Sequence, residues 1–131
     1  MFSIDEHMNR YVLTVGPQQT LEEGAQAMME RRVGSAMVVA KAGFIGIITE
    51  RDVLRAVANG RVPWSTKIED VMTSEPICAP PTIDVREATS LMMEHGFRHL
   101  PIVENGKLIG ILSLRDILMA GRKSSSEAKA S

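Results

Sequence analysis

Residues 46–52 read GIITERD and residues 110–116 read GILSLRD, so one seven-residue phrase returns 64 positions later. At this offset residues 4–56 align with residues 68–120 without a gap, and 15 of the 53 aligned pairs are identical. Self-similarity at a fixed spacing indicates that one supersecondary unit has been duplicated. The chain is therefore expected to fold as two copies of one pattern, and a site in one copy has a counterpart in the other.

Each copy has the same predicted order of elements, β-α-β-β-α, which places the chain in the mixed α/β (α+β) class. A short strand is expected over residues 12–15 and 77–79, before a turn that contains proline. Two further strand-like runs cover residues 35–49 and 99–113. Asn105-Gly106 lies inside the second of these regions and is a strong hairpin signal.

Two helices are predicted in each copy. The first begins at Thr20, where Thr20 and Glu23 fit a capping box, and correspondingly at Asp84, which can cap with Glu87 three residues later. The second helix is expected over residues 50–58 and 114–120, directly after the repeated phrase.

The segment between the copies does not favour a helix, because it contains Gly60 and Pro63. Trp64 in this segment is expected to pack over the edge of its own domain, with a role as an interaction anchor as the alternative. We expect a first repeat over residues 1–58, a linker over 59–67, a second repeat over 68–121 and a disordered tail over 122–131.

Size and charge exclude several classes of protein. A chain of 131 residues can form one compact unit, whereas each half alone would be marginal. The net charge of −1 gives no general attraction to nucleic acid or to anionic membranes, and aromatic residues make up only 4%. The N-terminal residues lack the basic and apolar regions of a signal peptide, and no apolar run has membrane-spanning length. We therefore expect a cytoplasmic protein with no membrane partner and no nucleic-acid partner.

Sulfur-containing residues are expected to have structural roles. Cys78 is the single cysteine, which excludes an internal disulfide and a cysteine-based metal cluster. Its apolar surroundings in sequence favour a buried small side chain over a reactive thiol. The paired methionines Met28-Met29 and Met92-Met93 lie within predicted helices, where core filling is favoured over an adaptable binding surface.

The repeated phrase allows two interpretations. Thr49 and Ser113 are expected to be N-caps of the following helices, with Asp52 and Asp116 at the third helical position. A capping box favours Glu or Gln at that position, because a longer side chain reaches the cap amide more easily. The alternative is a nucleotide site, in which the aspartate accepts hydrogen bonds from ribose hydroxyls and the helix start faces a phosphate.

At this point the sequence resembles the cystathionine β-synthase (CBS) domain family, as a tandem pair known as a Bateman module. The supporting phrases are TLEEGAQAMMERRVGSAMVV, GIITERDVLRAV, IEDVMT and TIDVREATSLMMEHGFRHLPIVENGKLIGILSLRDIL, and the resemblance covers residues 4–120. It implies two β-α-β-β-α repeats packed about a pseudo-twofold axis, with adenosine-containing ligands bound in the clefts between them. It also implies a homodimer that forms a flat disc of four CBS domains.

The resemblance assigns roles to positions in both copies. Ribose would be bound by Asp52 and Asp116. Thr49 and Ser113 would lie near the ribose or phosphate. Beyond the resemblance, the residues that could contact phosphate by their charge or donors are Arg98, His99, Arg115 and Arg51. Arg51 and Arg115 could equally lie on the outer helix face. The residues placed around the base are Leu13, Thr14, Val15, Met37, Val38, Ile77, Cys78, Ala79, Pro101 and Ile102.

The two copies differ where phosphate would bind. The second copy has Arg98-His99 at the start of its second strand, whereas the first copy has Gly34-Ser35. Arg98 can make a bidentate contact with phosphate, and His99 can donate a hydrogen bond. The alternative is a solvated Arg98 and a His99 that is satisfied by the local backbone. If only one cleft binds a charged nucleotide tightly, we expect Asp116 to mark it.

Catalytic motifs are absent, since the sequence has no nucleophile elbow, no phosphate-binding loop and no HExxH motif. We therefore expect a regulatory module, not an enzyme. It would sense AMP, ADP or ATP, the last with Mg²⁺, and signal to an unknown effector protein through conformational or dimer changes. No other cofactor and no protein-bound metal are expected. The alternatives are a structural or dimerisation module with non-binding clefts, and a module that binds S-adenosylmethionine or NAD.

Overall fold

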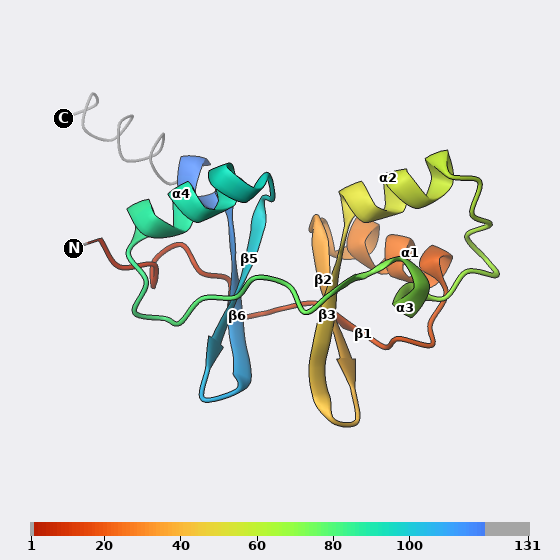
Figure 1. Cartoon of the computed structure of the whole chain (residues 1–131), viewed down its shortest axis with the longest axis horizontal. Helices are drawn as coiled ribbons and strands as arrows, with labels where there is room; N and C mark the ends of the chain where they lie inside the picture. Colours follow the sequence, from red (N-terminus) through yellow and green to blue (C-terminus); the bar gives the residue numbers. More distant parts are fainter. Residues whose placement is uncertain (1, 120–131) are drawn as a thin grey trace. The chain divides into compact units, whose positions relative to one another are not determined.

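The computed structural model describes residues 2–119, and the chain divides into two compact units (Figure 1). One unit is Val12–Pro76, which we call the first-hairpin unit. The other combines Met1–Tyr11 with Ile77–Ser131, and we call it the second-hairpin unit. The tail predicted over residues 122–131 lies outside the described residues.

The first-hairpin unit contains a four-stranded sheet in the order β1-β2-β3-β4. Strand β1 (Thr14–Val15) is parallel to β2 (Ser35–Ala40), which forms an antiparallel hairpin with β3 (Gly43–Thr49). Strand β4 (Thr73–Ser74) pairs with the other edge of β3. The sheet thus ends with a strand that lies beyond the predicted linker.

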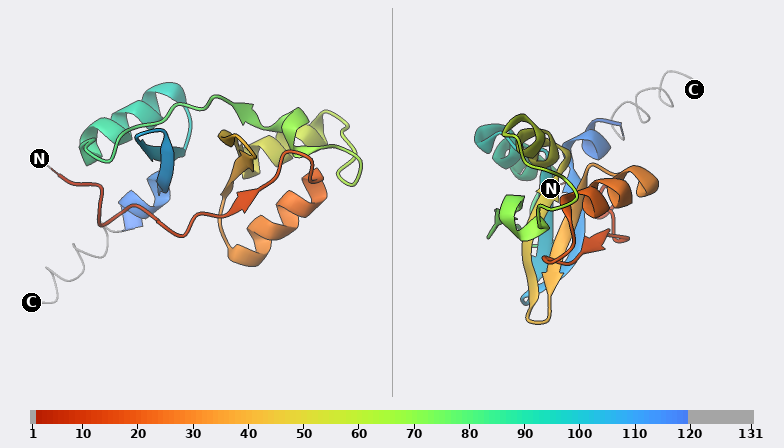
Figure 2. Two further views of the ribbon diagram at one scale, coloured as in Figure 1. Left: turned by 90° about the horizontal axis from the view of Figure 1, so that it is seen from below. Right: turned by 90° about the vertical axis from the view of Figure 1, so that its right-hand side faces the viewer.

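Three helices complete the first-hairpin unit. They are α1 (Leu21–Arg31), α2 (Glu50–Ala58) and the short α3 (Ile68–Val71). Helices α1 and α2 lie on the same side of the β2–β3 hairpin, as Figure 2 shows from two further directions. The predicted range of α2 and the predicted cap of α1 at Thr20 are confirmed. The buried side chains of this core are Val15, Leu21, Met28, Ala36, Val38, Ile48, Ala56 and Ile68.

The second-hairpin unit contains α4 (Val85–His95) and the antiparallel hairpin of β5 (His99–Glu104) and β6 (Lys107–Ser113). Residues 114–119 are helical. Asn105 and Gly106 both have positive φ, 52° and 78°, as a tight two-residue hairpin turn requires. The predicted hairpin is therefore confirmed, and so is the mixed α/β class.

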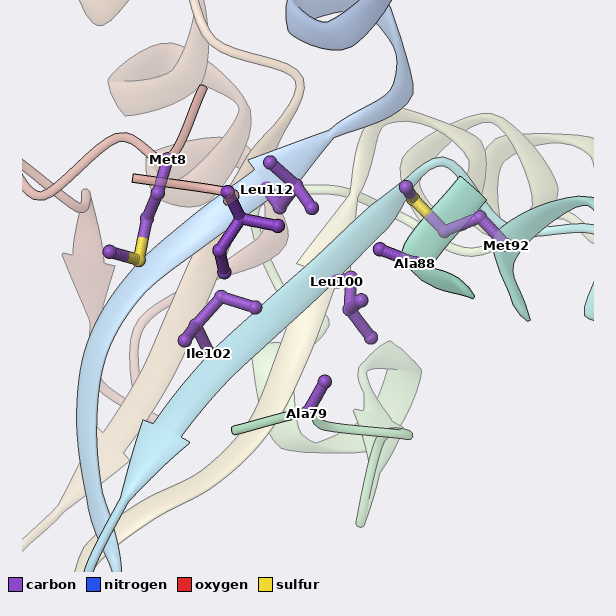
Figure 3. Packing of buried hydrophobic residues seen from close by; sticks show 8 residues of the cluster. Met8, Ala79, Ala88, Met92, Leu100, Ile102 and Leu112 are labelled. Atoms are coloured by element: carbon purple, nitrogen blue, oxygen red, sulfur yellow. The ribbon is translucent and has the colours of Figure 1, made fainter. Parts of the chain in front are cut away.

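The core of the second-hairpin unit is formed between its helix and its hairpin. Figure 3 shows Leu100, Ile102 and Leu112 of the hairpin together with Ala88 and Met92 of α4. Met8 and Ile4, which come from the other end of the chain, belong to the same cluster. Ile4 is fully buried, so the N-terminal segment is part of this core.

Each hairpin is completed by the segment that begins the other repeat. In the first-hairpin unit, Thr73 pairs with Ile47 of β3. At the equivalent positions of the second-hairpin unit, Asn9 pairs with Ile111 of β6. Ile4 and Ile68 occupy equivalent positions in the repeat, and each is fully buried in the core of the other repeat's hairpin. The compact units therefore exchange the first residues of the two sequence repeats.

Gly46 and Gly110 are needed where these exchanged segments pass the hairpins. A Cβ atom at Gly46 would lie 2.8 Å from Met72 Sδ and 2.8 Å from the Thr73 carbonyl oxygen. A Cβ atom at Gly110 would lie 2.6 Å from Met8 Sδ and 2.9 Å from the Asn9 carbonyl oxygen. Glycine lacks a side chain and so permits this close approach of backbone atoms.

Some sequence predictions are wrong in detail. The strand predicted over residues 77–79 is reduced to one bridge between Ala79 and Ile102, and Cys78 is exposed. Side chains alternate along extended backbone, so the burial of Ala79 turns Cys78 outward. Trp64 is 69% exposed and does not pack over its own unit.

The methionine pairs and the cap of α4 also differ from expectation. Met28 and Met92 fill the cores, whereas Met29 and Met93 are exposed, because neighbouring residues on a helix face different directions. Asp84 caps α4 as predicted, but its carboxylate accepts from the Arg86 and Phe2 amides, and the described residues show no return bond from Glu87. Within residues 2–119 no helix is both long and apolar enough to cross a membrane.

Candidate functional site

The strand register brings the predicted phosphate residues to the start of the helix that directly follows the hairpin in each unit. In the second-hairpin unit, His99 of β5 pairs with Ser113 of β6, and the Leu114 amide donates to the Arg98 carbonyl oxygen at 2.9 Å. In the first-hairpin unit, Ser35 pairs with Thr49, and the Glu50 amide donates to the Gly34 carbonyl oxygen at 3.0 Å. The two candidate sites therefore share one backbone framework and differ in their side chains.

In the first-hairpin unit, Asp52 is part of a complete capping box. The Thr49 amide donates to Asp52 Oδ2 at 2.9 Å, and the Thr49 hydroxyl donates to the same oxygen at 3.1 Å. The Asp52 amide in turn donates to Thr49 Oγ1 at 3.3 Å. Glu or Gln is favoured at this position of a capping box, but here the shorter Asp52 completes the box.

The other Asp52 oxygen is also occupied. Arg55 Nη1 lies 3.2 Å from Asp52 Oδ1 and forms an ion pair three residues along α2. Asp52 is only 5% exposed. Both of its carboxylate oxygens therefore have partners within the same helix start, and sequence reasoning did not include Arg55. The signal that could have found Arg55 is a cation three positions after an acidic residue on a helix.

In the second-hairpin unit, Asp116 has different surroundings. Its amide donates to Ser113 Oγ at 3.0 Å, so Ser113 caps the helix, but Asp116 itself is exposed. Among residues 2–119 its carboxylate has no hydrogen-bond or ion-pair partner. Position 119, which corresponds to Arg55, is Met119. The Asp116 carboxylate can therefore accept hydrogen bonds from a ligand without losing any from the described protein.

The basic side chains near the helix starts are at the surface. Arg98, Arg51 and Arg115 are exposed, and His99 is half-buried. The Arg98 carbonyl oxygen contacts the Leu114 amide, which places residue 98 beside the cap Ser113. Arg98 and Asp116 thus supply opposite charges at the edge of one helix start, suited to a ligand with an anionic part and a hydroxyl-bearing part.

The predicted base-contacting residues fall into two groups. Val15, Met37, Val38, Ala79, Pro101 and Ile102 are buried, Leu13 is half-buried, and Thr14, Ile77 and Cys78 are exposed. Four of the buried residues belong to the cores of their units: Val15, Val38, Ala79 and Ile102. Contacts with a base at these positions would come from backbone atoms or from the exposed side chains.

Neighbouring atoms partly desolvate the exposed Cys78 sulfur, which raises the pKa of this thiol and favours its unreactive, protonated form. Within residues 2–119, no three His, Cys, Asp or Glu side chains converge as a metal site would require.

Comparison with known proteins gives consistent results. The family model described as CBS domain matches residues 4–59 and again residues 68–123. CBS domain-containing protein YhcV of Bacillus subtilis is 37% identical over 118 residues, covering 89% of this chain and 84% of that protein.

Two solved structures extend the comparison. An uncharacterized conserved protein from Pyrococcus horikoshii has a TM-score of 0.85 and 34% identity, with 92% of both chains covered. CBS domain protein PAE2072 from Pyrobaculum aerophilum, solved in complex with AMP, has a TM-score of 0.80 and 31% identity. The similarity to PAE2072 covers 88% of this chain and 89% of that one.

Proposed function

The chain belongs to the CBS domain family, and we propose that it senses an adenosine nucleotide, AMP, ADP or ATP, at Asp116 of its second repeat. A pair of CBS domains is a regulatory module, and this chain carries two matches to the family. The observation that carries the proposal is the exposed Asp116 carboxylate, which has no partner among residues 2–119. The Asp116 amide donates to Ser113, and the Arg98 carbonyl oxygen accepts from the Leu114 amide at the same helix start. The complex of PAE2072 with AMP supports the class of ligand.

The ribose part of the ligand is assigned to Asp116. Two neighbouring ribose hydroxyls can each donate to one oxygen of a carboxylate, and hydrogen bonds to an ionised acceptor are stronger than neutral ones. Both Asp116 oxygens are open to this pair of donors.

The phosphate part is assigned to Arg98, with His99 and Ser113 as further donors. The Arg98 guanidinium has several N–H groups in a planar fork that matches phosphate oxygens. Arg115 lies one residue before Asp116 and is also exposed, so it can add charge. The first-hairpin unit has Gly34-Ser35 in place of Arg98-His99, which is why we place the tighter site in the second repeat.

Signalling would pass through a second copy of the chain and then to an effector protein. Met29 and Leu54 are 80% and 69% exposed, and their repeat equivalents Met93 and Leu118 are 69% and 60% exposed. Large apolar side chains at equivalent helical positions of both units support a self-association surface. We propose a homodimer through these helices, in the cytoplasm, where adenine nucleotides are abundant. A ligand that binds one dimer arrangement more tightly shifts the population toward it.

The test is calorimetric titration of the full chain with AMP, ADP, ATP, NAD and S-adenosylmethionine. Asp116→Ala should abolish detectable binding of the preferred ligand, since it removes the acceptor of two charge-assisted hydrogen bonds. The matched control is Glu104→Ala, which removes the same charge at the other end of the β5–β6 hairpin, where Glu104 pairs with Lys107. Unchanged binding by Asp116→Ala would refute the site.

A structural or dimerisation module is the alternative function, and the exposed helical methionines favour it independently of any ligand. It predicts a stable dimer whose melting temperature is unchanged by every nucleotide tested. Preferential binding of S-adenosylmethionine or NAD in the same titrations would instead reassign the adenosyl ligand.

A further inference from the structure

Resting on the proposed function, we propose that Arg55 determines the specificity of the chain by keeping Asp52 from binding ribose. In this view one chain binds one adenosine nucleotide, at Asp116, although both repeats carry the aspartate. The proposal depends on the different partners of two equivalent carboxylates.

The first repeat satisfies its own carboxylate. Thr49 donates to Asp52 Oδ2 through its amide and its hydroxyl, and Arg55 Nη1 contacts Oδ1 at 3.2 Å. A ribose diol would have to displace Arg55 from Oδ1. Each hydrogen bond from ribose to that oxygen would then replace an existing one, with little net gain in binding free energy. Asp52 is also 5% exposed, which leaves little surface for a ligand to contact.

The second repeat lacks this internal partner. Met119 stands where the first repeat has Arg55, and a thioether cannot neutralise the Asp116 carboxylate. Asp116 is exposed, and its carboxylate has no partner in residues 2–119. The residue three positions after the aspartate therefore decides whether the carboxylate has an ion-pair partner, as Asp52 has, or has none, as in Asp116.

Arg55 is replaceable without loss of the fold. Its side chain is 62% exposed, and the capping box of Thr49 and Asp52 does not involve it. An exposed ion pair makes a small contribution to stability. Arg55→Met copies the second repeat into the first and frees Asp52 Oδ1, with methionine as a good helix former in place of arginine.

The experiment measures AMP and adenosine binding by calorimetry in the full-length parent, in Arg55→Met and in four variants that carry Asp116→Ala. Asp116→Ala removes the proposed site, and Arg55→Met/Asp116→Ala adds the proposed release of Asp52. Arg61→Met/Asp116→Ala is the control. Arg61 is an exposed arginine just after α2 that does not contact Asp52, so its replacement removes the same charge without freeing the Asp52 carboxylate. Arg55→Met/Asp116→Ala/Asp52→Ala tests whether recovered binding depends on Asp52.

We expect no binding to Asp116→Ala, recovered binding to Arg55→Met/Asp116→Ala, and loss of that binding when Asp52 is also replaced. The recovered site should discriminate less than threefold between AMP and adenosine, since Gly34-Ser35 replaces Arg98-His99. The Arg61 control should remain silent. Arg55→Met alone should bind two equivalents of ligand where the parent binds one.

The outcomes separate this inference from the proposed function. If the parent binds at Asp116 but Arg55→Met/Asp116→Ala stays silent, the role of Arg55 is wrong and the Asp116 site stands. If the parent does not bind but Arg55→Met does, the second-repeat site is wrong and the role of Arg55 stands. If neither the parent nor Arg55→Met binds, both the Asp116 site and the role of Arg55 are refuted. A parent that already binds two equivalents refutes the role of Arg55.

Discussion

Met8 lies directly against Gly110, so close that a Cβ atom at residue 110 would come within 2.6 Å of the Met8 Sδ and Cγ atoms. The two residues belong to different sequence repeats but to one compact unit. Met72 and Gly46 repeat the relationship in the first-hairpin unit. This reciprocal contact explains why each repeat needs glycine at this position of its second hairpin strand.

Gly110→Ala should lower the free energy of unfolding by about 1–3 kcal/mol, because a backbone carbonyl oxygen as well as Met8 must move. Gly46→Ala should cost a similar amount. The control is Gly16→Ala, where the nearest atom to the new Cβ is 3.8 Å away and the change should stay within about 0.5 kcal/mol. Urea denaturation measures all three, and equal stability of the three variants would contradict the packing described.

Ile4→Ala should destabilise the chain by about 2–5 kcal/mol, although residue 4 lies near the N-terminus. Ile4 is fully buried in the core that contains Met92 and Leu100. Glu6→Ala, an exposed change in the same segment, should have an effect within about 0.5 kcal/mol. An Ile4→Ala variant as stable as the parent would show that the segment does not belong to this core in solution.

Asp52→Ala and Asp116→Ala should have opposite effects on stability and binding. Asp52→Ala removes the capping box and the partner of Arg55, so we expect about 1–2 kcal/mol lower stability with nucleotide binding retained. Asp116→Ala should abolish binding at a stability cost below about 1 kcal/mol, since the described structure gives its carboxylate no partner. Thermal unfolding and calorimetry together check this, and a reversed pattern would exchange the roles of the two aspartates.

Asp84 should contribute to acid unfolding. The Phe2 amide and, to a smaller extent, the Arg86 amide donate to its carboxylate and lower the pKa of Asp84 from its ordinary value. A carboxyl with a lowered folded-state pKa stabilises the fold above its unfolded pKa, and this stabilisation is lost as pH falls through the folded pKa. Asp84→Asn should therefore be less stable than the parent at neutral pH and lose less stability below about pH 4. Parallel urea midpoints for both proteins across this range would argue against the role of Asp84.

Met29→Glu with Met93→Glu should convert the proposed dimer to monomers. Charges at these exposed helical positions would have to be desolvated in a self-association surface. Val62→Glu, which charges an exposed apolar residue in the connector, is the control and should leave the dimer intact. Light scattering after size exclusion measures the mass, and a dimer that survives both methionine changes would exclude this surface.

Local interactions made several elements predictable. The helix start at Thr20 and the turn at Asn105-Gly106 are determined by contacts over two or three residues, and both were predicted and confirmed. Cys78 and Trp64 were placed wrongly, because burial depends on which distant side chains surround a residue and not on its neighbours in sequence.

The candidate site shows the same division. The grouping of Arg98, His99, Ser113 and Asp116 followed from the repeat and from the family resemblance. The different surroundings of the two aspartates are visible only in the folded structure, because they depend on the conformations of the Asp52 and Arg55 side chains. A sequence comparison alone shows Arg55 opposite Met119 but does not show what either residue contacts.

The sequence by itself determined the duplicated β-α-β-β-α order and the equivalence of Asp52 with Asp116, because caps, turns and periodicity are properties of short segments. The tertiary structure decided that Ile4 packs into the core of the second repeat's hairpin and Ile68 into the core of the first repeat's hairpin. It also decided that Asp52 forms an ion pair with Arg55, whereas Asp116 is exposed. Those outcomes depend on contacts between residues far apart in the chain and on side-chain geometry. Chain order does not specify either of them.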